Sequence, residues 1–370
     1  MHADASRQND ARGDGPASER FARLHQELRS HTAELEEADA SCAAQLDRMV
    51  TAGVMKWGIP AQFGGQEMSA ADQVANFERL AAACLVSAFV LSQRNAAVSR
   101  IVASNHEPLR ADLLPKLAAH ELMTTVGISH LTTSRQHLGR PSVSVTPHRD
   151  GYLFDGEVPW VTAASISDLV LTGGTLSDGR QLLALVPTDD PTVTVGAAPP
   201  LLALNASQTG SLSPARTFVG RERIVAGPIE GVIKAASGGT GSVTTSALAV
   251  GAAAGVLEHF AREVEKRPEL AEIAEPLAAE RAAISQAIRE HVEATSAERA
   301  PSESSESIRH RANSLVLRAS QAYLAASKGA GFVKGHPAER AVREAMFFLV
   351  WSCPQPVVNA ALRQFACLTG

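Results

Sequence analysis

Hydroxyl and backbone groups gather in residues 124–133 (TTVGISHLTT), where a short apolar run passes into a loop. Hydroxyls and backbone N–H groups in such a loop can hydrogen-bond the polar edge of a ring or a phosphate. The same composition also fits an ordinary threonine-rich β turn. The stretch therefore predicts either a cofactor-binding loop or a plain turn.

A tryptophan and a threonine stand two residues apart in residues 155–164 (DGEVPWVTAA). On a β-strand this spacing places Trp160 and Thr162 on the same face. That face would offer a flat apolar surface and a hydroxyl to a planar ring. The alternative interpretation is an ordinary core tryptophan.

A third candidate lies near the C-terminus, in residues 327–356. Gly329 and Gly331 allow the backbone to approach a bound group closely. A basic helical segment and an apolar run follow, and Pro354 and Pro356 end any helix that passes through Trp351. The stretch fits the wall and lip of a pocket, and it also fits a helix end followed by a core helix and a loop.

The elements that must position these residues change character twice along the chain. Residues 17–122 carry helical patterns, residues 123–228 carry short β-type runs between Gly, Pro, Asp and Ser clusters, and residues 229–370 return to helix. We therefore expect an α+β protein: an N-terminal helical domain, a middle antiparallel β domain and a C-terminal helical bundle. Residues 1–16 are polar and predict a disordered tail.

Two local patterns in the first region make testable predictions. Phe21, Leu24, Leu28 and Leu35 have the spacing of one amphipathic helix, and residues 70–91 contain no helix breaker and predict a single buried helix. Polar residues 93 and 94 follow it and fit either a helix cap or a pocket lining.

Composition excludes several classes of protein. The net charge of −5 and the pI near 6.2 give no reason to expect nucleic-acid binding. We find no apolar run long enough to span a bilayer, and no signal peptide. The four cysteines lack metal-binding spacing and predict reduced, mostly buried thiols in a cytoplasmic protein without a metal site: Cys42, Cys84, Cys353 and Cys367.

Four stretches in the right order resemble the acyl-CoA dehydrogenase superfamily. They are residues 57–65 (WGIPAQFGG), 151–164 (GYLFDGEVPWVTAA), 328–332 (KGAGF) and 336–345 (HPAERAVREA). Together with the helical–β–helical layout, the resemblance covers nearly the whole chain from about residue 20. It implies a flavin, FAD with FMN as the alternative, bound between the β domain and the C-terminal bundle, in a homodimer or homotetramer.

The resemblance also implies which residues would hold the flavin. Trp160 and Thr162 match the family motif that flanks the isoalloxazine ring. The loop before them supplies ring and phosphate contacts, and the glycine turn contributes contacts across the dimer. The matching positions are Thr125, Val126, Gly127 and Thr133 in the loop, and Lys328, Gly329 and Gly331 in the turn.

Family dehydrogenases remove a substrate proton with a carboxylate, and this chain departs from that pattern. Counting from Arg343, the usual glutamate falls on Ser352, and the alternative position falls near Thr244. A serine without a partner base cannot remove an α-proton at neutral pH. The family's Arg-x-x-Phe-Gly motif is not recognisable in residues 265–270, where Lys266 or Arg267 could retain a phosphate contact or form a solvated charge run.

Three functions are compatible with these residues. The first is an acyl-CoA dehydrogenase-like flavin oxidoreductase with an unusual base, acting on a small molecule or an acyl thioester and passing electrons to an acceptor. The second is a monooxygenase of the same superfamily, which uses reduced flavin from a reductase and oxygen. The third is a non-catalytic scaffold that kept the fold. Candidate pocket residues are Ser352, His130, Arg94 and Gln93.

Overall fold

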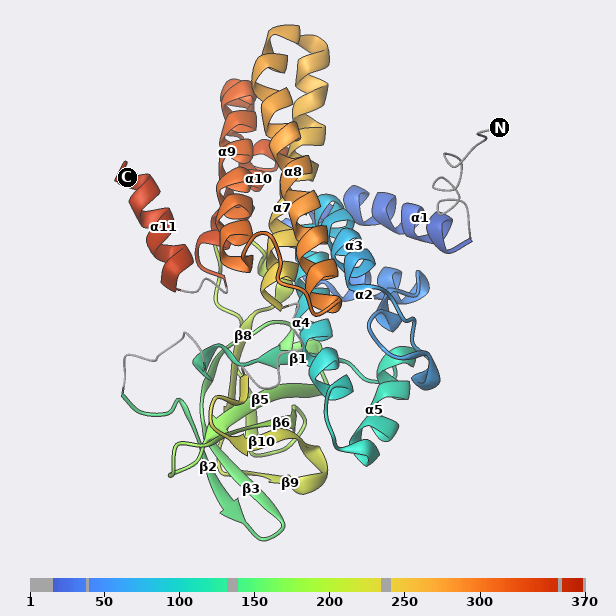
Figure 1. Ribbon diagram of the computed structural model, residues 1–370, viewed down its shortest axis with the longest axis vertical. Coiled ribbons are helices and arrows are strands. Elements are labelled where there is room, and N and C mark those ends of the chain that lie inside the picture. The colour runs from blue at the N-terminus through green and yellow to red at the C-terminus, as the bar shows by residue number, and fades with distance from the viewer. Residues whose placement is uncertain (1–15, 38–39, 132–138, 234–240, 352–354, 369–370) are drawn as a thin grey trace.

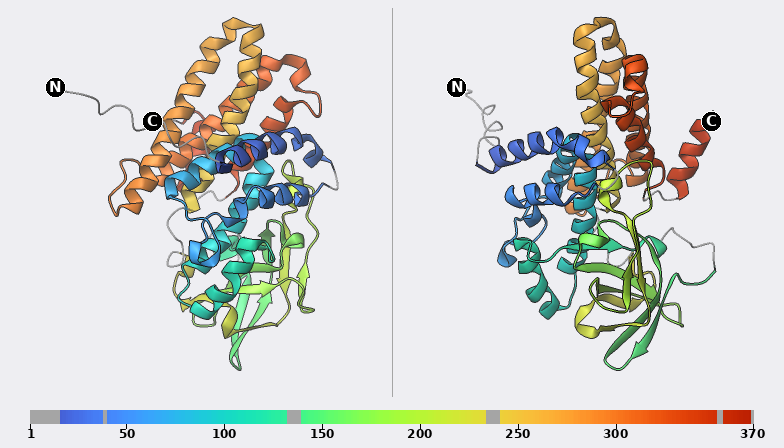
Figure 2. Two further views of the ribbon diagram at one scale, coloured as in Figure 1. Left: turned by 90° about the vertical axis from the view of Figure 1, so that its right-hand side faces the viewer. Right: turned by 180° about the vertical axis from the view of Figure 1, so that it is seen from behind.

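A computed structural model describes residues 16–37, 40–131, 139–233, 241–351 and 355–368. Helices come first along the chain, strands second and helices third, so the predicted α+β order is confirmed (Figure 1). The long C-terminal helices stand above the sheet domain, and the N-terminal helices pack against both (Figure 2). Residues 1–15, for which a tail is predicted, lie outside the described part of the chain.

The N-terminal region consists of α-helices joined by loops and 3-10 turns. The predicted helix through Phe21 and Leu35 ends early, because Leu35 lies on a separate 3-10 turn, η1 (Thr32–Glu36). Both side chains are nevertheless buried in one core. The helices are α1 (Pro16–Ser30), α2 (Ala43–Thr51), α3 (Ala70–Ala83), α4 (Leu85–Val102) and α5 (Glu107–Ala119).

The prediction of one helix over residues 70–91 is wrong, because α3 and α4 are separated at Cys84. This residue is extended (φ −158°, ψ 110°), although its N–H still donates to the carbonyl of Leu80 at 2.8 Å. Neither glycine nor proline marks the break, so local propensity could not indicate it. The change of direction lets α4 pack against both strand β1 (Thr124–Gly127) and helix α7 (Gly241–Lys266).

The strands form a seven-stranded and a three-stranded sheet in the described residues. The larger sheet is mixed and not purely antiparallel as predicted, because β1 and β2 both pair in parallel with β5. Parallel neighbours need a crossover, and residues 128–168 between β1 and β5 provide it. The strands are β1, β2 (Val143–His148), β3 (Gly151–Gly156), β4 (Val158–Val161), β5 (Leu169–Thr175), β6 (Gln181–Pro187), β7 (Val193–Val195), β8 (Gly210–Pro214), β9 (Thr217–Gly220) and β10 (Ile224–Ile229).

The C-terminal region is a helical bundle with α7 at its centre. A Cβ atom at Gly251 would lie 2.2 Å from the carbonyl oxygen of Glu78, so this glycine allows α7 to approach α3. The other elements are α8 (Ala271–Ser296), α9 (Ser305–Gly331), α10 (Pro337–Met346), η10 (Phe347–Leu349) and α11 (Gln355–Phe365).

The segment Val243–Lys266 of α7 is long and apolar enough to cross a bilayer, contrary to our expectation from sequence. Of its most apolar window, 67% is buried inside the fold. The apolar residues of α7 pack against α3 and α9, which explains this composition by burial in the bundle.

Candidate functional site

Strand β1 is buried along its whole length and holds three of the predicted binding residues. The hydroxyl of Thr125 donates to the carbonyl oxygen of Thr162 at 2.8 Å, and Val126 packs in a hydrophobic cluster with α4 and α5. A Cβ atom at Gly127 would lie 2.7 Å from a methyl group of Val161, so glycine lets β1 close against β4. These residues position the start of the Thr162 segment. Thr133, the fourth predicted loop residue, lies outside the described residues.

Trp160 and Thr162 do not share one face as the two-residue spacing predicts. Trp160 is 48% exposed on β4, whereas Thr162 is 5% exposed and follows the end of that strand. The pairing of β4 with β8 shifts register between Val158 and Val161, which breaks the alternation. The indole therefore lies open to solvent beside a buried hydroxyl.

A chain of hydroxyl groups supports Thr162 from behind. The Thr209 hydroxyl donates to the Thr162 Oγ1 at 3.1 Å, and the Oγ of Ser207 lies 2.9 Å from the Thr209 Oγ1. The backbone N–H of Ala163 donates to the carbonyl oxygen of Ser207 at 2.9 Å. Because the Thr162 oxygen accepts a bond here, its own proton is left to donate elsewhere. Sequence reasoning missed Ser207 and Thr209, since they lie more than 40 residues from Thr162.

His130 and Arg94, two predicted pocket residues, hold the fold together. The Nε2 of His130 lies 2.9 Å from the carbonyl oxygen of Gly173 on β5. Arg94 is 1% exposed and donates from Nη2 to the carbonyl oxygen of Leu117, at the end of α5, at 2.7 Å. Burial lowers the pKa of Arg94 to about 10. The neighbouring Gln93 donates to the hydroxyl of Ser92 at 3.0 Å.

The predicted glycine turn lies at the end of α9. Lys328 interrupts the helix with a left-handed backbone (φ 54°, ψ −150°) and is exposed together with Gly329, whereas Gly331 is buried. Arg267 donates to the carbonyl oxygen of Ala326 at 2.7 Å, just before this turn, and to Glu263 at 2.9 Å. Arg267 is therefore used by the bundle, whereas Lys266, the last residue of α7, pairs with Glu263 at 2.9 Å on the exposed surface.

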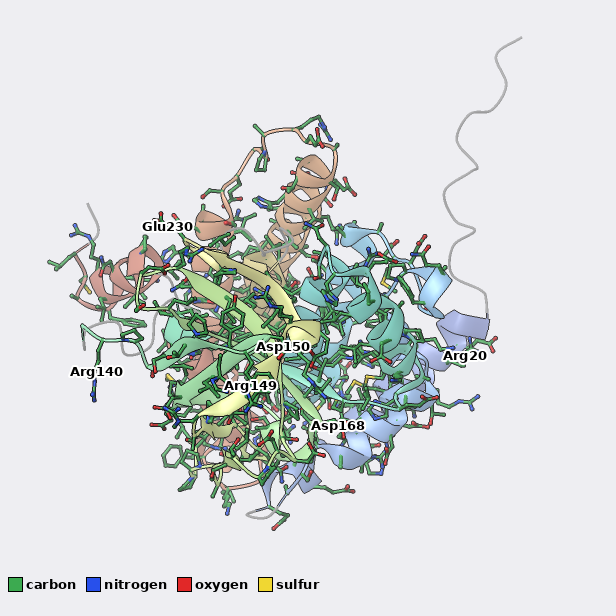
Figure 3. The ribbon with its side chains drawn as sticks, turned by 90° about the horizontal axis from the view of Figure 1, so that it is seen from below. Arg20, Arg140, Arg149, Asp150, Asp168 and Glu230 are labelled. Carbon is green, nitrogen blue, oxygen red and sulfur yellow. The ribbon has the colours of Figure 1, made fainter. Side chains whose placement is uncertain are left out.

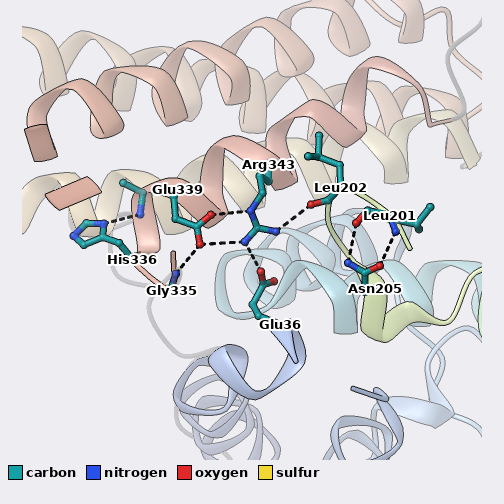
Figure 4. A network of polar contacts seen from close by, with 9 residues as sticks. Glu36, Leu201, Leu202, Asn205, Gly335, His336, Glu339 and Arg343 are labelled. Atoms are coloured by element: carbon teal, nitrogen blue, oxygen red, sulfur yellow. Dashed lines mark hydrogen bonds and ion pairs between the residues drawn. The ribbon is translucent and has the colours of Figure 1, made fainter. Parts of the chain in front are cut away.

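The HPAERAVREA segment forms α10 and is fixed by Arg343 (Figure 4). Arg343 pairs with Glu36 on η1, donates from Nε to Glu339 at 2.7 Å, and donates to the carbonyl oxygen of Leu202 at 3.1 Å. Glu339 also accepts from the backbone N–H of Gly335 at 2.8 Å. One guanidinium thus joins α10 to the N-terminal region and to the loop that precedes β8.

An aromatic cluster follows α10 and leads to the position that the resemblance assigns to the base. The Trp351 ring stacks on Phe347 with centroids 5.0 Å apart, and it meets Phe89 of α4 at 4.9 Å. Arg309, buried on α9, donates to the carbonyl oxygen of Trp351 at 2.8 Å. The residue before Ser352 is therefore anchored on two sides. Ser352 itself lies outside the described residues.

Comparison with known proteins gives the N-terminal region a matching family model and the whole chain a fold. Residues 19–121 match the family model for the N-terminal domain of acyl-CoA dehydrogenase. The butyryl-CoA dehydrogenase of Megasphaera elsdenii superposes with a TM-score of 0.81 at 15% identity, covering 96% of this chain and 99% of that chain. The chain has the acyl-CoA dehydrogenase fold. No curated protein gives a significant sequence match.

The acyl-CoA dehydrogenase fold is shared with solved proteins of other chemistry. The dibenzothiophene monooxygenase TdsC from Paenibacillus sp. A11-2, in its FMN-bound form, has a TM-score of 0.77 at 17% identity and covers 96% of this chain and 98% of its own. FkbI, described for biosynthesis of the methoxymalonyl extender unit of FK520, has a TM-score of 0.79 at 21% identity, covering 95% of this chain and all of its own. At these identities the likeness shows the fold alone.

Within this acyl-CoA dehydrogenase fold, Glu344 is a titratable group that sequence reasoning missed. It is partly buried on α10, directly after Arg343, and its Oε1 is shielded from solvent without a hydrogen bond in the described part of the chain. Burial raises the pKa of Glu344 to about 7, and the charge of Arg340 opposes that rise. Glu344 also helps to raise the pKa of the Cys84 thiol, mainly an effect of burial, so α10 lies close to the α3–α4 break.

Proposed function

We propose that the protein is a flavin-dependent oxidoreductase that holds the flavin ring against β4. The observation that carries this proposal is the exposed indole of Trp160 on β4, followed two residues later by the Thr162 hydroxyl, to which Thr209 donates. Thr209 occupies the Thr162 oxygen as donor, so the Thr162 proton is available to a ring acceptor.

These residues fit a planar, polar-edged ring. The 48% exposed indole of Trp160 offers a flat apolar surface for stacking. Thr125, on the buried strand β1, donates to the backbone carbonyl of Thr162 and so fixes the turn that carries the Thr162 hydroxyl. A bound flavin would supply the hydride or electron transfer that amino-acid side chains cannot perform. The contribution of the chain is to orient that ring and to present one proton at Thr162 Oγ1.

The substrate reaction depends on the segment after α10. The base positions implied by the family carry Ser352 and Thr244 in place of a carboxylate. An acyl-CoA dehydrogenase-like reaction would therefore need an unusual base or an unusual acyl thioester or small-molecule substrate. The missing carboxylate specifically favours a second candidate, a monooxygenase that uses reduced flavin and oxygen and needs no such base. The fold likeness to a dibenzothiophene monooxygenase is compatible with this alternative.

The proposal includes further components. FAD is our first choice of cofactor, and FMN remains the alternative, since one solved protein with this fold is FMN-bound. The exposed turn at Lys328 and Gly329 would contact a flavin held by a second copy in a cytoplasmic homodimer or homotetramer. An electron acceptor or a flavin reductase would complete the reaction.

Flavin titration tests the proposal directly. Purified protein is titrated with FAD and with FMN, and ring binding is followed by the absorption spectrum and by quenching of flavin fluorescence. Saturable binding that is lost in Thr162→Val supports the proposal. The absence of flavin uptake would overturn it and leave the non-catalytic scaffold.

The same sample separates the two reactions. Bleaching of the bound flavin by an acyl-CoA identifies dehydrogenase chemistry. Oxygen consumption that requires NADH and an added flavin reductase, together with an oxidised organic substrate, identifies the monooxygenase.

A further inference from the structure

A pocket lies on the N-terminal domain, far along the chain from strand β4 with Trp160 and from the turn with Thr162. It has a volume of about 490 Å³ and lies between α1, the end of α2, the loop around Trp57 and α3. No lining residue belongs to the sheet domain. Figure 3 shows one of its lining residues, Arg20 on α1, at the side of the molecule, away from the labelled Arg149 and Asp150 in the turn between β2 and β3. The pocket is therefore separate from the proposed flavin site.

The floor of this pocket is aromatic and well packed. The rings of Phe21 and Trp57 lie 5.5 Å apart between centroids, and Trp57 meets Phe77 edge-on at 6.5 Å. Phe21 and Trp57 are 7% and 5% exposed, so they offer ring edges on a rigid base. The guanidinium carbon of Arg79 lies 4.3 Å from the centre of the Phe21 ring. This cation–π contact holds Arg79 beside the floor.

The lining of the pocket is positively charged. It contains Arg20, Lys56 and Arg79 and includes no carboxylate. In the part of the chain that the structure describes, none of the three forms an ion pair or a side-chain hydrogen bond. The nearby Glu67 lines an adjacent pocket of about 470 Å³ instead. The lining therefore brings three cations together without a carboxylate among its described residues.

Partial burial of Arg79 strengthens the attraction between the site and an anion. Burial lowers the pKa of Arg79, and no charged group contributes to the shift. An anion that enters the pocket would therefore meet a partly desolvated guanidinium, which binds a carboxylate more strongly than a fully hydrated cation does. A volume of about 490 Å³ is within the range of small-molecule pockets.

From these contacts we infer that the pocket binds a small aromatic carboxylate, with its ring over the edges of Phe21 and Trp57 and its carboxylate between Arg79 and Lys56. The apolar floor selects against a bare inorganic anion, and the cations select against a neutral ring. The long side chain of Arg20, on α1, lines a third side of the pocket.

A matched pair of ligands tests the charge requirement. The full chain is titrated calorimetrically with 1-naphthylacetate and with its neutral analogue 1-naphthylacetamide. We expect the acid to bind at least ten-fold more tightly at low salt, with a preference that falls as salt is added. Equal affinity for the two compounds would overturn the inference, and so would inorganic phosphate that binds as tightly as the naphthyl acid.

Variants locate the site. Lys56→Gln and Arg79→Gln should each reduce the preference for the acid about three- to ten-fold. Arg23→Gln removes the same charge from an exposed position of α1 outside the lining and should leave the preference unchanged. The Lys56 side chain is exposed and forms no ion pair or hydrogen bond with the described residues, so Lys56→Gln remains a fair test if Arg79→Gln is unstable. Unchanged binding in Lys56→Gln would contradict the inference, and flavin uptake should stay normal in that variant.

Discussion

Two of the four stretches that carry the family resemblance use their polar groups in opposite ways. They are residues 336–345, here called the α10 motif, and residues 151–164, called the β4 motif. In the α10 motif, Arg343 directs its guanidinium to Glu36, Glu339 and the carbonyl of Leu202. In the β4 motif, Thr162 accepts bonds from the protein and keeps one proton to give away. One motif is used by the fold, and the other leaves the Thr162 hydroxyl proton without an acceptor among the described residues. A motif match alone does not separate these two roles.

The loop before β8 connects the two motifs. Its Leu202 carbonyl accepts from Arg343, and Asn205 closes the loop by bonding both the N–H and the carbonyl of Leu201, at 2.7 and 2.9 Å (Figure 4). Ser207 and Thr209 follow directly and reach Thr162. The contacts of Arg343, here called the α10 clamp, therefore support the loop that carries Ser207 and Thr209. Substitutions at Arg343 and at Thr162 measure whether the two motifs act independently.

The largest effect is expected from Arg343→Ala. The substitution removes bonds to two carboxylates and one carbonyl and leaves Glu36 and Glu339 without their partner. We expect a loss of about 3 kcal/mol in the free energy of unfolding, measured by urea denaturation. Arg363→Ala, at an exposed position of α11, is the matched control and should change little. A stability loss below about 1 kcal/mol would show that the clamp is not structural.

The pH dependence of stability tests Glu344 of α10, whose Oε1 has no hydrogen bond within the described part of the chain. The pKa of Glu344 is about 7 in the folded protein, above its usual value of 4.5. A raised carboxyl pKa means that its stabilising contribution is complete below pH 4.5 and is lost as the pH rises through 7.

Glu344→Gln cannot ionise, so the variant should gain on the wild type between pH 4.5 and 7. Above pH 7 it should be more stable by on the order of 2 kcal/mol, discounted from the full shift because the residue is only partly buried. Unfolding curves at pH 4, 6 and 8 measure the difference. Parallel stability profiles for the two proteins would contradict the assignment of the raised pKa to Glu344.

Thr162→Val tests the role of the Thr162 hydroxyl in the β4 motif. Valine keeps the shape of the side chain but cannot donate to a ring acceptor, so we expect about ten-fold weaker flavin binding, equivalent to about 1.4 kcal/mol. Fluorescence titration with FAD measures it. The control Thr217→Val also removes a buried hydroxyl, one that donates to the carbonyl of Thr192 at 3.1 Å, but lies on β9. Equal loss in both variants would indicate a general effect on the sheet domain.

Sequence patterns predicted the order of the domains and most element positions, because periodicity and breaker residues are local signals. They failed at Cys84, where packing breaks a helix without a breaker residue, and at Trp160, where a register shift ends the alternation. For Arg94 they left a helix cap and a pocket lining open, and in the structure its guanidinium donates to the end of α5. Whether a polar residue serves the fold or a ligand depends on partners far along the chain, as the pairing of Thr209 with Thr162 illustrates.

The smallest effect is expected from Thr209, which acts on the flavin only through Thr162. Thr209→Val removes the donor to the Thr162 oxygen, so the Thr162 hydroxyl can rotate and donate inward. We expect about three-fold weaker flavin binding and a shifted absorption maximum of the bound flavin, with Thr209→Ser restoring both because it keeps the hydroxyl. If Thr209→Val lowers only thermal stability and leaves the flavin spectrum unchanged, the hydroxyl chain belongs with Arg343 to the fold. The contrast between the two motifs would then rest on Thr162 alone.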